Sequence, residues 1–121
     1  EFVLNKVSQI MEEKGMTDYK RVGLYGLTYK ENVDDFRESP TLQLLEAQKK
    51  HLAEPLKVYD PYIKRDIVSN QYHDLNQFLK DVDLVIIMVK HQEIIDNMNL
   101  LENKVVFDTQ NICNFKNTYK L

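Results

Sequence analysis

Two basic side chains and a helix start lie close together in the stretch "GLTYKENVDDFRESPTLQLLE", residues 26–46. Lys30 carries a mobile positive charge that suits a phosphate, and Arg37 carries a planar fork that suits bidentate contacts with an anion. Ser39 followed by Pro40 is the pattern of a helix N-cap and a first helical residue, and a helix N-terminus offers free backbone donors. The pattern predicts a loop that binds an anionic ligand such as a diphosphate.

The same stretch has a second interpretation that involves no ligand. Asp34, Asp35 and Glu38 could neutralise the two basic side chains in a local ion-pair network, and spacing alone leaves both interpretations open. Tyr29 could stack on a base or a sugar, or it could fill the core. The two adjacent aspartates are a poor metal pair, because neighbouring residues of an extended loop point in opposite directions.

Other patterns that could carry chemistry are weaker. Gly23 and Gly26 lack the G-x-G-x-x-G spacing of a dinucleotide-binding turn, and no helix begins directly after them. The histidines at positions 51, 73 and 91 show no i, i+4 pairing for a metal, so we expect each on the surface or at a helix cap. Cys113 has no histidine beside it and is expected to be a buried thiol rather than a nucleophile. We therefore predict no metal site and no catalytic residue.

The composition of this 121-residue chain is that of a soluble globular protein. A net charge of −3 argues against non-specific binding of nucleic acid, which needs a basic face. No apolar run approaches the roughly 20 residues that cross a bilayer, and the N-terminal stretch lacks the pattern of a signal peptide. A single cysteine fits a reducing compartment. The sequence thus predicts a cytoplasmic protein with no nucleic-acid or membrane partner.

Helical and strand patterns alternate along the chain. Apolar residues at helical spacing precede Gly15, Ser39 and Pro40 open a second helix that runs to about His51, and Asp74 is a plausible cap for a third. Strands are expected at about 22–25, 55–61, 83–89 and 104–111, and the remaining helices at 73–82 and 91–101. The polar tail "FKNTYKL" is expected to fray.

The alternation with short connections predicts parallel strands and right-handed crossovers, and hence a three-layer α/β domain. Ligands of such sheets bind beyond the carboxyl ends of the strands. The loops 26–39, 60–65 and 108–112 are expected at that edge. Asp60 and Asp108 each begin such a loop directly after a strand.

The stretch "VGLYGLTYKENVDDFRESP" resembles the start of the C-terminal domain of the nucleotide-sugar 6-dehydrogenases, a family that includes the UDP-glucose, GDP-mannose and UDP-N-acetylmannosamine dehydrogenases. The resemblance continues through "TLQLLEAQKK", "LKVYDP", "DLVIIMVKH" and "KVVFDTQN", and it covers about residues 20–113. It implies a Rossmann-like parallel sheet with flanking helices, preceded by the end of a long interdomain helix. Residues 1–18 would be the end of that helix, and residues 19–121 the nucleotide-sugar-binding domain.

The resemblance also implies roles for individual residues. Tyr29 and Lys30 would contact the UDP-sugar, Lys30 by its charge. Arg37 matches an arginine that reaches the NAD held by the other, N-terminal domain. Gln110 stands near the position where many relatives carry a basic residue used on the substrate; glutamine can form hydrogen bonds there but cannot neutralise charge.

The implied activity is two successive hydride transfers to NAD, which oxidise a C6 hydroxyl to a carboxylate through a cysteine-bound intermediate. The glycine-rich motif with the catalytic cysteine, the catalytic lysine and the dinucleotide fingerprint are missing from this sequence, so Cys113 does not inherit the role and the chain is expected to be inactive alone. The resemblance favours UDP-N-acetylmannosamine and the synthesis of capsule or surface polysaccharide, with UDP-glucose as the alternative. It implies a homodimeric parent.

Two non-enzymatic classes compete with this interpretation. A receiver-type signalling module is also a parallel α/β domain, but it needs an acidic pair directly after the first strand and an acceptor aspartate after the third. Asp34 and Asp35 lie too far along, and the third strand is followed by Lys90 and His91. An interaction domain, with loop 26–39 as an ion-paired lid, is the other.

Overall fold

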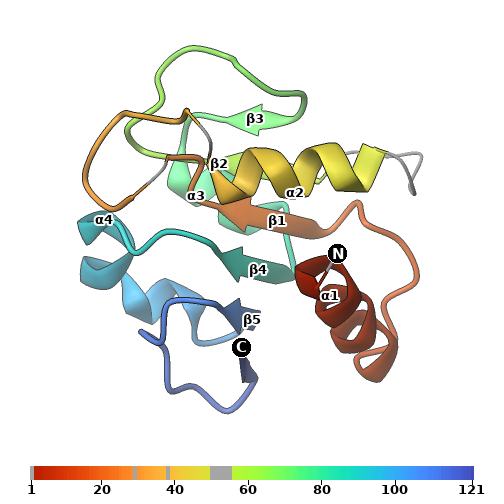
Figure 1. Cartoon of the computed structure of the whole chain (residues 1–121). Helices are drawn as coiled ribbons and strands as arrows, with labels where there is room; N and C mark the ends of the chain where they lie inside the picture. The colour runs from red at the N-terminus through yellow and green to blue at the C-terminus, as the bar shows by residue number, and fades with distance from the viewer. Residues whose placement is uncertain (1, 29, 38, 50–55) are drawn as a thin grey trace.

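The computed structural model describes residues 2–28, 30–37, 39–49 and 56–121. Within these residues a six-stranded, all-parallel sheet has the order β3-β2-β1-β4-β5-β6 (Figure 1). The strands are β1 (Val22–Tyr25), β2 (Lys57–Tyr59), β3 (Gln71–Tyr72), β4 (Leu84–Ile87), β5 (Val105–Asp108) and β6 (Thr118–Lys120). The central pair, β1 and β4, is buried along its whole length, which explains the continuous apolar runs in the sequence.

Helices cover both faces of the sheet and make it the middle of three layers. They are α1 (Phe2–Glu13), α2 (Pro40–Lys49), α3 (Leu75–Lys80), α4 (Gln92–Asp96) and the 3₁₀ turn η1 (Met98–Leu101). Leu4 of α1 and Leu44 of α2 join one buried cluster with Leu24 of β1. Phe78 of α3 and Ile94 of α4 join a second cluster, with Val85 of β4. The predicted three-layer α/β fold is confirmed. None of the described helices has the length and apolar character needed to cross a lipid bilayer.

The predicted helix ends have the expected local chemistry. Gly15, at φ 72°, follows α1, and the amide of Met16 donates to the carbonyl of Met11 at 2.8 Å, as in a Schellman ending. The Ser39 hydroxyl accepts from the amide of Thr41 at 3.1 Å at the start of α2. The Asp74 carboxylate likewise accepts from the amide of Gln77 at 3.0 Å before α3.

The structure differs from the predicted elements at the edges of the sheet. The tail expected to fray contains β6, which pairs with β5 so that Tyr119 lies opposite Phe107. The edge strand β3 was not predicted, and the helix expected over 91–101 is divided into α4 and η1. These strands have two and three residues, with partly exposed side chains, so no apolar run marks them. The predicted helix end at His51 lies outside the described residues.

Candidate functional site

The strand order reverses direction between β1 and β4. Counting along the sheet, β1 is followed outward by β2 and β3 on one side, and by β4, β5 and β6 on the other. A doubly wound sheet binds its ligands in the crevice outside the carboxyl ends of the strands at such a switch point. The loops that leave β1, β2 and β4 meet there. Loops 26–39 and 60–65 were expected at this edge, whereas the exit of β4, residues 88–91, was not.

A buried carboxylate joins the first two of these loops. Asp60 follows β2 directly, and its side chain has no exposed surface. Its Oδ2 accepts from the amide of Leu27 at 2.7 Å and from the amide of Thr28 at 3.2 Å. Its Oδ1 accepts from the amide of Tyr62 at 2.8 Å. Asp60 is thus a structural acceptor for backbone donors rather than a carboxylate open to a ligand.

His91 joins the third loop to the other two. Its imidazole is fully buried, and Nε2 lies 2.8 Å from Asp60 Oδ2. Nδ1 accepts from the amide of Asn32 at 2.9 Å, so the ring carries its proton on Nε2 and donates it to Asp60. His91 does stand at the N-cap of α4, but its side chain makes no capping hydrogen bond. The expected surface position is therefore excluded for His91. Its burial could have been predicted from its place in the sequence, just after the most apolar strand.

Arg37 and Lys30 differ in how they are paired. The guanidinium of Arg37 forms two hydrogen bonds with Asp35, each at 3.0 Å, and its side chain is 84% exposed. These hydrogen bonds lower the pKa of Asp35 to about 2. Lys30 is also exposed, and no ion pair links it to a residue in the described ranges. The local ion-pair interpretation therefore holds for Arg37, whereas Lys30 has no ion-pair partner among the described residues, and its charge only adds to the lowering of the Asp35 pKa. Tyr29 and Glu38 lie outside the described residues.

The helix that begins at Pro40 offers fewer donors than the sequence indicated. Pro40 has no N–H, and the Ser39 hydroxyl accepts from the amides of Thr41 at 3.1 Å and Leu42 at 3.4 Å. The Ser39 carbonyl accepts from the amide of Gln43 at 3.2 Å. The expectation of free backbone donors at this terminus is wrong, because the N-cap that starts the helix also occupies them.

Gln110 lies at the same sheet edge, after β5. Its side-chain Nε2 donates to the carbonyl of Met88 and to Thr109 Oγ1, each at 3.0 Å. Asp108 organises this turn by accepting from the amides of Gln110 at 2.9 Å, Ile112 at 2.6 Å and Cys113 at 2.7 Å. Both amide protons of Gln110 thus have partners within the chain, and its Oε1 is the atom left for a further contact.

The thiol of Cys113 is expected to react slowly while the chain is folded. It is fully buried, and burial together with the Asp108 carboxylate raises its pKa from 9.0 to about 11. Alkylation by iodoacetamide should therefore stay slow until the pH approaches 11, and should proceed rapidly near pH 9 in urea. Because the folded pKa exceeds the unfolded one, loss of this proton above pH 9 favours unfolding. Equal rates for folded and unfolded chain at pH 8 would contradict this assignment.

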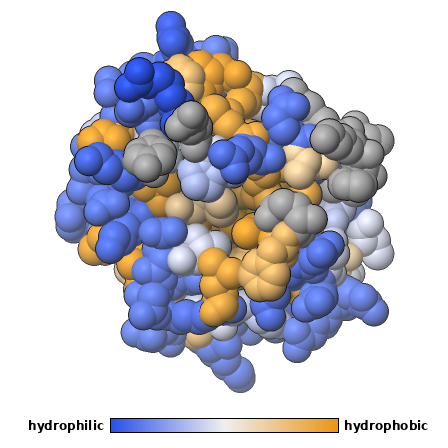
Figure 2. All heavy atoms as spheres, viewed as in Figure 1, coloured by the Kyte–Doolittle hydropathy of each residue, from blue (hydrophilic) through white to orange (hydrophobic). Residues whose placement is uncertain are grey.

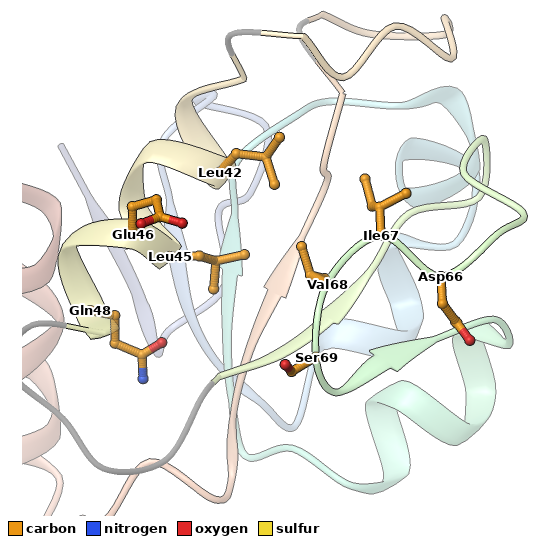
Figure 3. Close-up of a pocket in the computed structure, with 8 residues that line it drawn as sticks. All are labelled: Leu42, Leu45, Glu46, Gln48, Asp66, Ile67, Val68 and Ser69. Carbon is orange, nitrogen blue, oxygen red and sulfur yellow. The ribbon is translucent and has the colours of Figure 1, made fainter.

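A separate pocket of about 550 Å³ lies between α2 and the segment that leads to β3. Figure 2 shows the face that carries α1 and α2, where apolar patches are broken up by hydrophilic side chains. Figure 3 shows Leu42 and Leu45 projecting from α2 toward Ile67 and Val68, with Asp66 at the rim. An apolar lining with acidic residues at its rim does not suit a diphosphate. No cluster of three or more His, Cys, Asp or Glu side chains in the described ranges could hold a metal ion.

The family model of the UDP-glucose/GDP-mannose dehydrogenase family, UDP binding domain, matches residues 23–115. The chain is 32% identical to a UDP-N-acetyl-D-mannosamine dehydrogenase from Methanocaldococcus jannaschii, over 93% of this chain and 27% of that protein. It is 28% identical to an NDP-N-acetyl-D-galactosaminuronic acid dehydrogenase from Ralstonia nicotianae, over 78% of this chain and 23% of that protein. The chain thus spans about a quarter of the length of the curated relatives it matches.

Solved structures share the fold. The native structure of the UDP-N-acetyl-mannosamine dehydrogenase Cap5O from Staphylococcus aureus superposes with a TM-score of 0.75 at 32% identity, over 98% of this chain and 29% of that one. A UDP-glucose dehydrogenase from Pyrobaculum islandicum superposes with a TM-score of 0.72 at 24% identity, over 94% of this chain and 27% of that one, and supports the fold alone.

Proposed function

This chain belongs to the UDP-glucose/GDP-mannose dehydrogenase family, as the match of its UDP binding domain to residues 23–115 shows, and from that premise we propose that the chain binds the UDP moiety of a nucleotide sugar at the carboxyl edge of β1 and β4. The observation that carries the proposal is the position of Lys30. It is exposed in the loop that leaves β1, at the switch point of the sheet, and no described carboxylate pairs with it. A lysine in such a position can bind a diphosphate as a mobile point charge.

The other predicted site residues take complementary roles in this proposal. Tyr29 contacts the UDP-sugar beside Lys30. Gln110 offers its Oε1, an acceptor, to a hydroxyl or an amide N–H of the ligand, because its own protons are used on Met88 and Thr109. Arg37, exposed and held by Asp35, reaches toward NAD bound by a separate domain.

We further propose that the longer parent protein is an NAD-dependent 6-dehydrogenase. NAD would accept two hydrides as the C6 hydroxyl of the sugar becomes a carboxylate. UDP-N-acetylmannosamine is the proposed substrate, in the synthesis of capsule or surface polysaccharide, because relatives at 32% and 33% identity carry that name. UDP-glucose is the alternative. The parent would act as a cytoplasmic homodimer, and this chain alone would be inactive.

In this proposal residues 1–18 are the segment that ends a connecting helix, whose last helical residue is Glu13, and residues 19–121 are the nucleotide-sugar-binding domain. Packing supports a firm junction between the two. Val7, Ile10 and Met11 of α1 are buried in the same cluster as Leu24 of β1. The end of the helix is therefore part of the core on that face of the sheet.

Binding of UDP should raise the melting temperature of the 121-residue chain. At a UDP concentration of about ten times Kd, linkage predicts about 1.4 kcal/mol of stabilisation, or about 5.5 °C for a chain of this length. Differential scanning fluorimetry with UDP, uridine and inorganic diphosphate would measure it. Uridine lacks the diphosphate and should have the smallest effect at equal concentration. A melting temperature that is unchanged by millimolar UDP would overturn the proposal.

A further inference from the structure

Three loops at the switch point are joined by one buried pair, Asp60 and His91. Loop 26–39 comes from β1, Asp60 from the exit of β2, and His91 from the exit of β4. We propose that His91 is a positioning residue, which fixes Asn32 and thereby holds the loop that carries Lys30. This inference rests on the proposed function of Lys30 in binding UDP.

The loop is anchored on both sides of Lys30. Before it, the amides of Leu27 and Thr28 donate to Asp60, and the Thr28 hydroxyl donates to the carbonyl of Lys30 at 2.9 Å. After it, the amide of Asn32 donates to His91 Nδ1 at 2.9 Å. Lys30 therefore lies in a short segment whose two ends are attached to the same Asp60–His91 pair.

Asn32 is also held in a backbone conformation that few residues adopt. Its φ is 59°, in the left-handed region, where asparagine is among the better tolerated side chains. Its Oδ1 accepts from the amide of Gln92 at 2.8 Å and from the hydroxyl of Tyr62 at 3.3 Å. Such a conformation persists when the surrounding contacts determine it, and here His91 accepts the hydrogen bond of the Asn32 amide.

The hydrogen bonds require a neutral imidazole with its proton on Nε2. A proton on Nδ1 would face the N–H of Asn32 and break that bond. The groups that face the ring fit this arrangement. At Nε2 they are the carboxylate of Asp60 at 2.8 Å and the hydroxyl of Thr28 at 3.2 Å. Beside the ring lie Tyr62, at 4.8 Å between centroids, and Tyr25, at 6.0 Å, whose hydroxyl is bound to Glu93 of α4.

Two substitutions separate ring packing from hydrogen bonding. His91→Phe keeps a planar ring between Tyr25 and Tyr62 but removes both nitrogens, and it should weaken UDP binding about tenfold, the effect of one lost hydrogen bond to a positioned loop. His91→Asn places an amide oxygen near the position of Nδ1, so it can still accept from Asn32 and should recover part of that loss. His73→Phe is the matched control, because His73 pairs with Asp66 at 2.6 Å in a more exposed position, directly before the N-cap of α3.

Nitrogen NMR tests the hydrogen bond between Asn32 and His91 and the tautomer of the ring without any ligand. In the wild-type chain, the amide nitrogen of Asn32 and Nδ1 of His91 should show a scalar coupling across their hydrogen bond, and the ring should give the signature of the Nε2–H tautomer. Amide exchange at Asn32 should be at least about tenfold faster in His91→Phe than in the wild type. Absence of the coupling, or the opposite tautomer, would overturn the inference.

The two proposals fail in different ways. A wild-type chain that does not bind UDP would overturn the proposed function, and with it the part of this inference that concerns UDP. A wild-type chain that binds UDP, with His91→Phe folded and of unchanged affinity, would overturn the positioning role alone. Both proposals are supported if His91→Phe binds UDP more weakly than the wild type, His91→Asn recovers part of the affinity, and His73→Phe keeps all of it.

Discussion

Replacement of Lys30 by glutamate is expected to weaken the binding of UDP at least about a hundredfold. A charge-assisted hydrogen bond contributes about 1.5–3 kcal/mol, and about 2.7 kcal/mol corresponds to a hundredfold change in Kd. The glutamate adds repulsion from the diphosphate to the loss of that contact. The fold should persist, because Lys30 is exposed and its carbonyl, rather than its side chain, receives the Thr28 hydroxyl. Titration of both chains with UDP, followed by NMR, measures the ratio of the two affinities.

Two matched variants show whether the effect is specific to this position. Lys116→Glu makes the same change of charge just before β6, at the opposite, amino edge of the sheet, and should leave the affinity for UDP within about twofold. Arg37→Ala should also leave it unchanged in this chain, because Arg37 is assigned to NAD on a separate domain. If Lys116→Glu weakens binding as much as Lys30→Glu, the attraction is a general effect of net charge and the proposed site is wrong.

Asp60→Asn is expected to lower the free energy of unfolding by about 3 kcal/mol. The carboxylate accepts four hydrogen bonds, three on Oδ2 and one on Oδ1, without any exposed surface. An asparagine must point its NH₂ at one of these two sets of donors. In the better orientation it faces the amide of Tyr62 and leaves that partly buried donor unpaired. The remaining bonds lose the assistance of the negative charge. Urea unfolding, with the slope m unchanged, measures the difference.

The chain offers a control for this substitution as well. Asp66 also pairs with a histidine, His73, but its side chain is 76% exposed. Asp66→Asn should therefore cost less than about 0.5 kcal/mol. If the two substitutions lowered the free energy of unfolding equally, burial would not explain the contribution of Asp60 to stability. If Asp60→Asn were as stable as the wild type, the account of the three joined loops would be wrong.

The central part of the fold could be predicted from the sequence because local signals and burial agree there. The strand that begins at Leu84 is apolar throughout since both its faces are covered, and Ser39 and Asp74 cap the helices that follow them. The edge strands β3 and β6 could not be predicted. Both are short and polar. They form strands because β3 pairs with β2 and β6 pairs with β5, and a loop separates each of them from its partner in the sequence.

The residues of the candidate site also divide into those that could be predicted from the sequence and those that could not. Lys30 and Arg37 could be predicted as site residues because basic side chains near the start of a helix indicate a binding site for an anion. The role of His91 is not visible, because its partners Asp60 and Asn32 are 31 and 59 residues away along the chain. The helix start was misjudged for a related reason. The hydroxyl of Ser39 that marks the terminus in the sequence also occupies its donors in the structure.

A residue-resolved NMR titration of the 121-residue chain with UDP tests the central claim most directly. We predict saturable shifts of the amides from Lys30 to Asn32 and of Thr109 and Gln110, the residues at the carboxyl edge of β1 and β5. Shifts centred instead on Leu42 and Val68, in the pocket beside α2, would contradict the account, as would a folded chain in which millimolar UDP shifts no amide.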